Sequence, residues 1–206
     1  MTFPIYLQSW RVFDLRKVKC ERKTKEVSIS VELDVDGKGN ADVKTGIKFL
    51  DHMLVTLAKH GLFDLKVEAT GDLVHHVSED VGLVLGEALY KATNKGMGIK
   101  RFGSAYVPMD ESLARAVVDL GGRPYSIRNL RLMQSQIEDL KTEDIEHFFD
   151  SLAQAAKANI HVAVIYGSNE HHMVEAAVKA LALALRQALT VEPRIGDDVP
   201  SAKGVL

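Results

Sequence analysis

The chain has 206 residues, 46% of them hydrophobic, so it is long enough to bury one large core or two smaller ones. Its 26 basic and 28 acidic residues leave a formal net charge of −2, which excludes a positive overall field that would attract nucleic acid or an anionic membrane. The longest apolar helical stretch, around residues 176–185, contains Lys179 and is too short to span a bilayer. We therefore expect a soluble globular protein that binds neither nucleic acid nor membrane.

Residues 1–21 are predicted to be an N-terminal extension. They lack the continuous apolar core and small-residue cleavage site of a secretory signal. Two interpretations stay open: a short organelle-targeting segment, or an arm in which Trp10, Phe13 and Leu15 pack on the domain. We favour the arm. The chain contains a single cysteine, Cys20, so it has no internal disulfide, and a reducing cytoplasm is its simplest location.

The first half of the chain alternates strand and helix patterns. Residues 26–35 alternate apolar and polar side chains, which predicts a half-buried strand. Residues 36–40 are turn formers and indicate that a hairpin follows. A helix is expected over 49–60, closed by Gly61, then a strand over 65–70 and a second helix over 75–93.

The second half repeats this order. Strands are expected over 114–120, 125–130 and 160–166, and helices over 142–158 and 170–190. When His147 is laid on His52, His171 falls on His75 after a one-residue gap. We predict an α+β fold that is an internally duplicated strands-helix-strand-helix unit, with the helices of each half on one face of its sheet and the halves at 22–108 and 109–206.

Histidines make the duplication chemically specific. Each half carries one lone histidine and one His-His-x-x-Glu pattern, and together these supply His52, His75, His76, Glu79, His147, His171, His172 and Glu175. A single histidine pair is commonly a chance feature of a surface or core. Two matched copies, each with a matched lone histidine, predict two metal sites.

Helix geometry divides these residues between the two sites. Residues i and i+4 share a helix face, so His75 with Glu79, and His171 with Glu175, can each hold one ion. The adjacent histidine lies about 100° around the helix and is expected to serve the other ion. Each metal then takes three imidazoles and one carboxylate. This donor set suits zinc, iron, nickel or manganese, and the spacing alone does not choose among them.

From about Arg22 to the last residue, the sequence resembles the imidazoleglycerol-phosphate dehydratase family of histidine biosynthesis. The resemblance rests on the two histidine patterns and on further motifs, namely Thr45-Gly46-Ile47, Phe49-Leu50-Asp51-His52-Met53-Leu54, His60-Gly61-Leu62-Phe63-Asp64, Met109-Asp110-Glu111, Asp119-Leu120-Gly121-Gly122-Arg123-Pro124 and Pro200-Ser201-Ala202-Lys203-Gly204-Val205-Leu206.

The resemblance implies a manganese-dependent lyase that converts imidazole glycerol phosphate into imidazole acetol phosphate and water. It also implies two Mn²⁺ ions per subunit, bound between neighbouring subunits of a homo-oligomer of 24 chains. By this mapping, one ion is held by His52, His76, His171 and Glu175. The other is held by His75, Glu79, His147 and His172.

The same mapping places the substrate. It implies that Glu26, His60 and Lys179 line the small phosphorylated imidazole substrate, and that its phosphate is held by Arg101, Arg123, Ser201 and Lys203. We expect Glu26 to act as acid or base, with the metal ligands His52, His76 and Glu175 also in catalytic positions. Metals beside the imidazole ring would stabilise the charge that spreads into it.

Two departures from the family pattern leave alternatives open. Members usually carry a pair of aspartates before the first histidine pair, whereas here a shorter segment, Gly71-Asp72-Leu73-Val74, leads directly into His75. Ala202 stands where threonine is usual. The chain could therefore be a metal-binding member with altered or lost turnover, or a two-metal hydrolase of a phosphorylated substrate. The retained phosphate residues favour the dehydratase.

Overall fold

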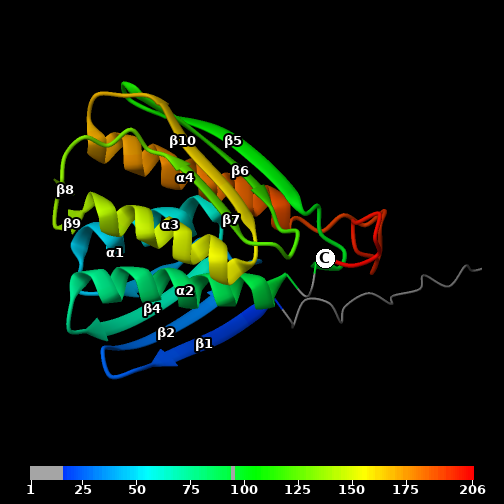
Figure 1. The fold of residues 1–206 in the computed structure, drawn as a ribbon. Coiled ribbons are helices and arrows are strands. Elements are labelled where there is room, and N and C mark those ends of the chain that lie inside the picture. Colours follow the sequence, from blue (N-terminus) through cyan, green and yellow to red (C-terminus); the bar gives the residue numbers. More distant parts are fainter. Residues whose placement is uncertain (1–15, 94–95) are drawn as a thin grey trace, which may run out of the picture.

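Four helices are enclosed between two four-stranded sheets in the computed structural model, which describes residues 16–93 and 96–206 (Figure 1). The layers run sheet, helix pair, helix pair, sheet. One face of each sheet is covered by the two helices of its own half, and the helix pairs then pack on each other in the middle of the molecule. The predicted duplicated α+β fold is confirmed. The proposed arm residues Trp10, Phe13 and Leu15 lie outside the described residues.

The first sheet has the strand order β1-β2-β4-β3. Its strands are β1 (Lys17–Lys23), β2 (Val27–Asp34), β3 (Ala41–Lys44) and β4 (Asp64–Gly71). The helices of this half are α1 (Lys48–Gly61) and α2 (Val74–Ala92). The alternation in β2 sends Val27, Ile29, Val31 and Leu33 into the core, because successive side chains of a strand point to opposite faces.

The second sheet repeats this plan with the order β5-β6-β10-β7. It contains β5 (Phe102–Met109), β6 (Ser112–Asp119), β7 (Tyr125–Asn129) and β10 (Asn159–Tyr166). The helices are α3 (Thr142–Ala156) and α4 (Glu170–Leu189), and a short hairpin of β8 (Gln136–Ile137) and β9 (Leu140–Lys141) precedes α3. In both sheets two antiparallel pairings are followed by one parallel pairing, so the duplication extends to strand topology.

The predicted hairpin after β2 is wrong. Instead of turning back on β2, the chain crosses to the far side of β4, where β3 pairs parallel with it. The Asp64 carboxylate at the start of β4 accepts hydrogen bonds from the backbone N–H groups of Lys38 and Asn40, at 2.8 and 2.9 Å. These bonds hold the loop beside β4 and direct the next strand to that edge.

The first strand of each sheet begins before the residue, 22 or 109, at which the sequence analysis placed the start of that half. Strand pairing places β1 in the first sheet and β5 in the second. Both are edge strands whose side chains are largely exposed: within β1 only Cys20 is buried, and within β5 only Gly103. An edge strand of this kind has little hydrophobic alternation, which is the signal that reveals a strand from sequence.

Helices α2 and α3 approach closely because α2 places glycines on the face that meets α3. A Cβ atom at Gly86 would lie 2.6 Å from the Leu152 carbonyl oxygen, and one at Gly82 would lie 2.8 Å from that of Phe148. Glycine is therefore required for this spacing. Within 16–93 and 96–206, no helix combines the length and apolar character needed to cross a membrane.

Candidate metal centre

Six of the eight predicted metal ligands gather in two groups of three. All four helices start at the same end of the molecule (Figure 1), and the grouped ligands lie within the first two turns of their helices. The first group is His52, His171 and Glu175, and the second is His75, Glu79 and His147. Within each group the possible ligand atoms lie within 4.8 Å of one another.

The first group centres on Glu175, which is 8% exposed. Its Oε2 atom lies 3.1 Å from His52 Nε2 and 3.4 Å from His171 Nε2. Its Oε1 atom accepts a hydrogen bond of 2.8 Å from the Lys179 ammonium. Burial alone would raise the pKa of Glu175, but hydrogen bonds from Lys179 and His52 outweigh it and lower that pKa. A carboxylate held ionised, with one oxygen free to face two imidazoles, is suited to bind a cation.

The second group is more open. His75 Nε2 lies 3.6 Å from Glu79 Oε2, one helical turn away on α2. The ring of His147, on α3, meets the ring of His75 edge-on with centroids 5.0 Å apart. The i to i+4 pairing expected from helix geometry is therefore present in both groups.

Each group combines residues from both halves of the chain. The lone His52 of the first half joins the His–Glu pair of α4, and the lone His147 of the second half joins the pair of α2. This exchange follows from packing, because α1 packs on α4 and α2 on α3.

The adjacent histidines point elsewhere, as helix geometry requires. His76 lies outside both groups, with its Nδ1 atom 2.8 Å from Asp72 Oδ1. His172 lies beside Asp110 and Glu111 in a third group of possible ligands. The hydrogen bond to Asp72 raises the pKa of His76, and the hydrogen bond to Glu111 raises that of His172. Within the described chain, each metal group therefore has three of its four predicted ligands.

A carboxylate faces the Nδ1 atom of all four paired histidines. The contacts are His75 to Asp144 at 2.6 Å, His76 to Asp72 at 2.8 Å, His171 to Glu138 at 3.1 Å and His172 to Glu111 at 2.9 Å. Histidines that bind metals through Nε2 characteristically donate their Nδ1–H to such a partner, which fixes the tautomer and the ring orientation. The donor set and its supporting carboxylates thus fit a divalent first-row metal.

Sequence reasoning missed these four carboxylates as functional residues. One had a local signal, because Asp72 precedes His76 by four residues, whereas Asp144 contacts a histidine 69 residues earlier in the chain. Glu138 and Glu111 reach their histidines across long sequence separations, so no local pattern identifies them.

The residues expected to line the substrate lie near the metal groups to different degrees. Glu26 is exposed at the turn between β1 and β2, and its charge contributes, after that of Asp72, to the raised pKa of His76. The Lys179 ammonium forms an ion pair with the Glu175 carboxylate. Desolvation, and then the nearby Lys179 ammonium, lower the pKa of His60 at the end of α1. Glu26 therefore lies near the start of α2, whereas His60, in the last turn of α1, and Lys179, in the middle of α4, lie near each other further along the helix layer.

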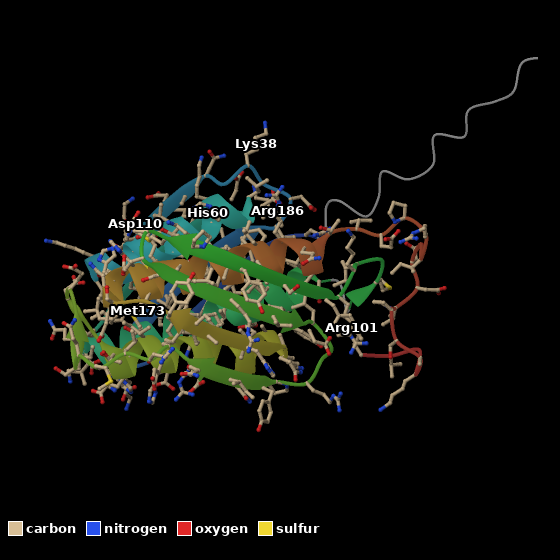
Figure 2. The ribbon with its side chains drawn as sticks, turned by 90° about the horizontal axis from the view of Figure 1, so that it is seen from above. Lys38, His60, Arg101, Asp110, Met173 and Arg186 are labelled. Carbon is tan, nitrogen blue, oxygen red and sulfur yellow. The ribbon has the colours of Figure 1, made fainter. Side chains whose placement is uncertain are left out.

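The expected phosphate residues lie at the opposite end of the molecule from the metal groups. The backbone N–H of Arg101 bonds to the Ala188 carbonyl at the end of α4, whereas His171 stands at the start of this 20-residue helix, which is about 30 Å long at 1.5 Å per residue. Figure 2 shows Arg101 far from Met173, the neighbour of His172. Arg101 also bonds to Pro200 O at 2.9 Å, so Ser201 and Lys203 lie at this end too.

Arg101 and Arg123 differ in their surroundings there. The Arg101 guanidinium makes a two-pronged ion pair with Asp119, with N–O distances of 2.6 and 3.0 Å. Arg123 is exposed, and its neighbour Gly122 contacts the C-terminal Leu206. One chain alone therefore does not bring the predicted metal and phosphate residues together.

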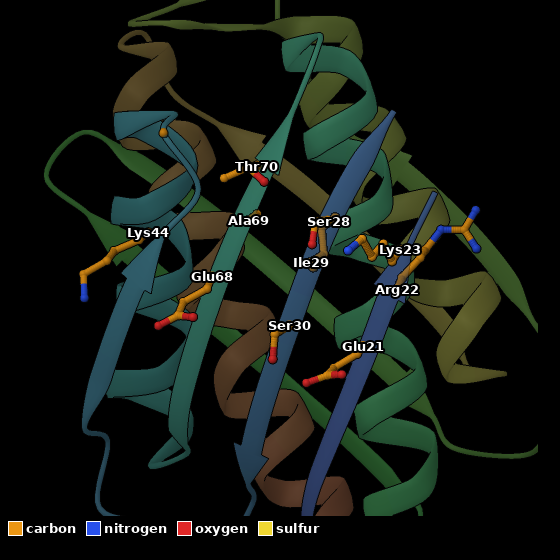
Figure 3. A pocket seen from close by; sticks show the side chains of 11 residues that line it. Glu21, Arg22, Lys23, Ser28, Ile29, Ser30, Lys44, Glu68, Ala69 and Thr70 are labelled. Carbon is orange, nitrogen blue, oxygen red and sulfur yellow. The ribbon is translucent and has the colours of Figure 1, made fainter. Parts of the chain in front are cut away.

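The outer face of the first sheet carries a hollow of about 650 Å³ that contains none of the predicted site residues. Figure 3 shows its lining of charged and hydroxyl side chains, among them Glu21, Ser30, Lys44 and Glu68. No histidine lines it, so it does not extend the metal groups. A smaller hollow of about 500 Å³ lies at the first group and is lined by Lys48, Phe49, His52, Glu138, Asp139 and His171.

Fold and site together define a class: a duplicated α+β protein with two histidine–carboxylate groups, each shared between its halves. A family model described as imidazoleglycerol-phosphate dehydratase matches residues 45–185. The chain belongs to the imidazoleglycerol-phosphate dehydratase family, a family of hydro-lyases, as its motifs predicted.

Relatives over nearly the whole length agree with this assignment. The imidazoleglycerol-phosphate dehydratase of Thermoanaerobacter pseudethanolicus is 49% identical, over 93% of this chain and 100% of its own length. That of Chlorobium luteolum is 48% identical, over 93% and 96%.

Solved structures of the family share the fold. The crystal structure of the enzyme from Staphylococcus aureus gives a TM-score of 0.76 at 37% identity, covering 85% of this chain and 100% of that chain. The enzyme from Pyrococcus furiosus, in complex with (S)-C348, gives a TM-score of 0.79 at 38% identity, covering 90% and 99%.

Proposed function

We propose that this chain catalyses the dehydration of imidazole glycerol phosphate to imidazole acetol phosphate in histidine biosynthesis, with two Mn²⁺ ions per subunit. The main support is the pair of three-residue histidine–glutamate groups in a chain of this family. Near-complete coverage of the relatives favours the dehydratase over a metal-binding protein without turnover, since these relatives bear the name of the enzyme. The two-metal hydrolase has no observation of its own in its favour.

We assign the ligands as helix geometry and the family mapping suggest. One ion takes His52, His171 and Glu175, with His76 from a neighbouring copy as the fourth ligand. The other takes His75, Glu79 and His147, with His172 from a neighbouring copy. Support comes from the Nδ1 contacts of these histidines to carboxylates, which leave the Nε2 atoms available.

The placement of the phosphate residues supports a site shared between copies of the chain. Since the metal groups and Arg101 lie at opposite ends of α4, a small substrate can touch both only where two chains meet. We therefore propose that the metal groups of one chain face Arg101, Arg123, Ser201 and Lys203 of another, in a homo-oligomer of 24 subunits as the family resemblance implies.

The reaction moves one hydroxide and one proton. The C–O bond on the carbon attached to the imidazole ring breaks, and a proton leaves the next carbon, which gives an enol. The enol becomes the ketone when a proton adds to the ring-side carbon and the enol hydroxyl loses its proton. Bound divalent ions would supply positive charge beside the ring, which stabilises charge that spreads into it. Glu26, beside His76, would move a proton at the substrate carbons. His60 has a lowered pKa, and a neutral imidazole can accept a hydrogen bond from a substrate hydroxyl.

The experiment is an assay of imidazole acetol phosphate formation with metal-stripped protein, before and after Mn²⁺ is added. We expect turnover only with Mn²⁺ and its loss in His75→Ala and His171→Ala. His161→Ala is a matched control, because His161 is exposed on β10 and belongs to no metal group. Turnover without a metal, or equal activity in all three variants, would contradict the proposal.

Assembly and location need separate measurements. Light scattering should give the mass of the 24-subunit particle. Mixing His147→Ala chains with Arg123→Ala chains should restore part of the lost activity, because some shared sites then receive both intact residues.

We also propose a cytoplasmic location, which the single cysteine, free and buried, supports.

A further inference from the structure

The turn between β8 and β9 contains a residue in an unfavourable backbone conformation. Glu138 has φ of 51°, in the left-handed region where glycine is the default residue. Its side chain is 60% exposed, so burial of the side chain does not explain a glutamate at this position. Strained residues of this kind concentrate at functional sites.

The Glu138 side chain reaches the first metal group. Its Oε1 atom lies 3.1 Å from His171 Nδ1. With the hydrogen on Nδ1, His171 donates this bond, and its Nε2 atom, 3.4 Å from Glu175 Oε2, keeps a lone pair available for a metal. The contact therefore selects the tautomer that a metal at Nε2 requires.

The next residue of the same turn holds the other helix of this group. Asp139 accepts hydrogen bonds from the backbone N–H groups of Lys48 and Phe49, at 2.8 and 2.9 Å. These begin α1, which has no side-chain cap of its own and which carries His52. The Phe49 ring in turn packs against the ring of His171, with centroids 5.1 Å apart. The turn thus contacts both helices that supply the first group.

In the second metal group, a carboxylate also faces the Nδ1 atom of a histidine, but its backbone is unstrained. The partner of His75 is Asp144, a buried residue in the first turn of α3, where the backbone is helical. In the first group, the equivalent carboxylate comes from the strained turn. Glycine would adopt φ of 51° there at no steric cost, but it would leave His171 Nδ1 without this partner.

We propose that Glu138 is a positioning residue, whose carboxylate fixes the tautomer and orientation of His171 so that the group of His52, His171 and Glu175 binds a divalent cation. The inference rests on the proposed function in taking this group as a metal site. Glu138 itself touches neither metal nor substrate.

The decisive variant is Glu138→Gly in the full-length protein. Because glycine relieves the backbone strain, we expect the midpoint of chemical unfolding to stay the same or rise. Affinity for Mn²⁺ at the first group should nevertheless fall 10- to 100-fold, the typical effect of losing such a partner. Calorimetric titration with Mn²⁺ should show one weakened and one unchanged class of site, since Asp144 still supports the second group.

Nitrogen NMR of the His171 ring provides a readout that a structural effect alone would not move. In the metal-free wild type we expect hydrogen on Nδ1, and in Glu138→Gly a mixture of tautomers. Glu138→Gln keeps a neutral acceptor and should lose less affinity than glycine. Glu143→Gln, an exposed glutamate paired with Lys141 instead of a histidine, should change neither measurement.

Each outcome decides a specific point. Unchanged affinity and tautomer in Glu138→Gly would overturn the inference and leave the proposed function standing. Equal weakening of both classes of site, with a lower unfolding midpoint, would reduce Glu138 to a structural role. A wild-type protein that binds no Mn²⁺ would overturn the proposed function, and the inference with it.

Discussion

Asp144 and His75 come from different halves of the chain and lie 2.6 Å apart, carboxylate Oδ1 to imidazole Nδ1. Asp144 is 2% exposed, in the first turn of α3, and His75 is in the first turn of α2. The pair ties together the two helices that supply the second metal group. It also holds His75 by the nitrogen that faces away from Glu79.

We predict that Asp144→Ala weakens Mn²⁺ binding at the second group 10- to 100-fold. The alanine leaves His75 Nδ1 without its acceptor, so the ring is free to rotate and to change tautomer. Asp144→Asn keeps an acceptor oxygen and should lose less. Calorimetric titration of the metal-stripped variants checks this, and affinity in Asp144→Ala equal to that of the wild type would contradict it.

Asn169 caps α4 and thereby places its histidine pair. Its side-chain oxygen accepts hydrogen bonds from the backbone N–H groups of His171 and His172, at 3.0 and 3.3 Å. Asn169→Ala should lower the free energy of unfolding by about 1 kcal/mol, whereas Asn169→Asp should preserve it, because aspartate is an equally good cap. Urea denaturation of metal-free protein measures both. A destabilised aspartate variant would show that the cap is not the cause.

Replacing Gly86 with alanine should have two opposing effects on stability. Replacing a helical glycine with alanine ordinarily stabilises a helix by roughly 1 kcal/mol. Here the new methyl group would lie 2.6 Å from the Leu152 carbonyl, and overpacking of this kind costs about 1–3 kcal/mol. We expect Gly86→Ala to be destabilising, measured by thermal unfolding. Stabilisation instead would mean that α2 and α3 separate easily.

Acid should weaken the loop that leads into β4. Hydrogen bonds from the backbone of Asn40 and then Lys38 lower the pKa of Asp64 below its ordinary 3.8. A carboxyl group with a lowered folded-state pKa adds stability above its unfolded pKa and loses it as pH falls through the folded value. Asp64→Asn should therefore be less stable than wild type near pH 7, and the difference should shrink well below pH 3.8. Urea midpoints across this range test it, and a constant difference would contradict the assignment.

The sequence predicted the helices well because helical periodicity is a strong local pattern. Helix α2 begins one residue before its expected start, and α4 begins at its expected start. The edge strands β1 and β5 were missed because most of their side chains are exposed. The crossover to β3 was also missed, since it depends on Asp64, which lies far along the chain from the loop it holds.

The candidate site shows the same limit. The spacing of His171 and Glu175 is a property of one helix, so the sequence reveals it directly. The contact of Glu138 with His171 depends on how a turn folds against another helix, and no periodicity encodes it. The separation of Arg101 from the metal groups likewise follows from the length of α4 and became visible only in the fold.

The exchange of lone histidines between the halves bears on the ancestry of the chain. Neither half holds the first or the second metal group by itself, because His52 meets the pair of α4 and His147 meets the pair of α2. A half-length ancestor would have assembled the same group only by docking against a second copy of itself. Fusion of two such copies turns that symmetric dimer into a single chain, in which each former protomer is then free to diverge.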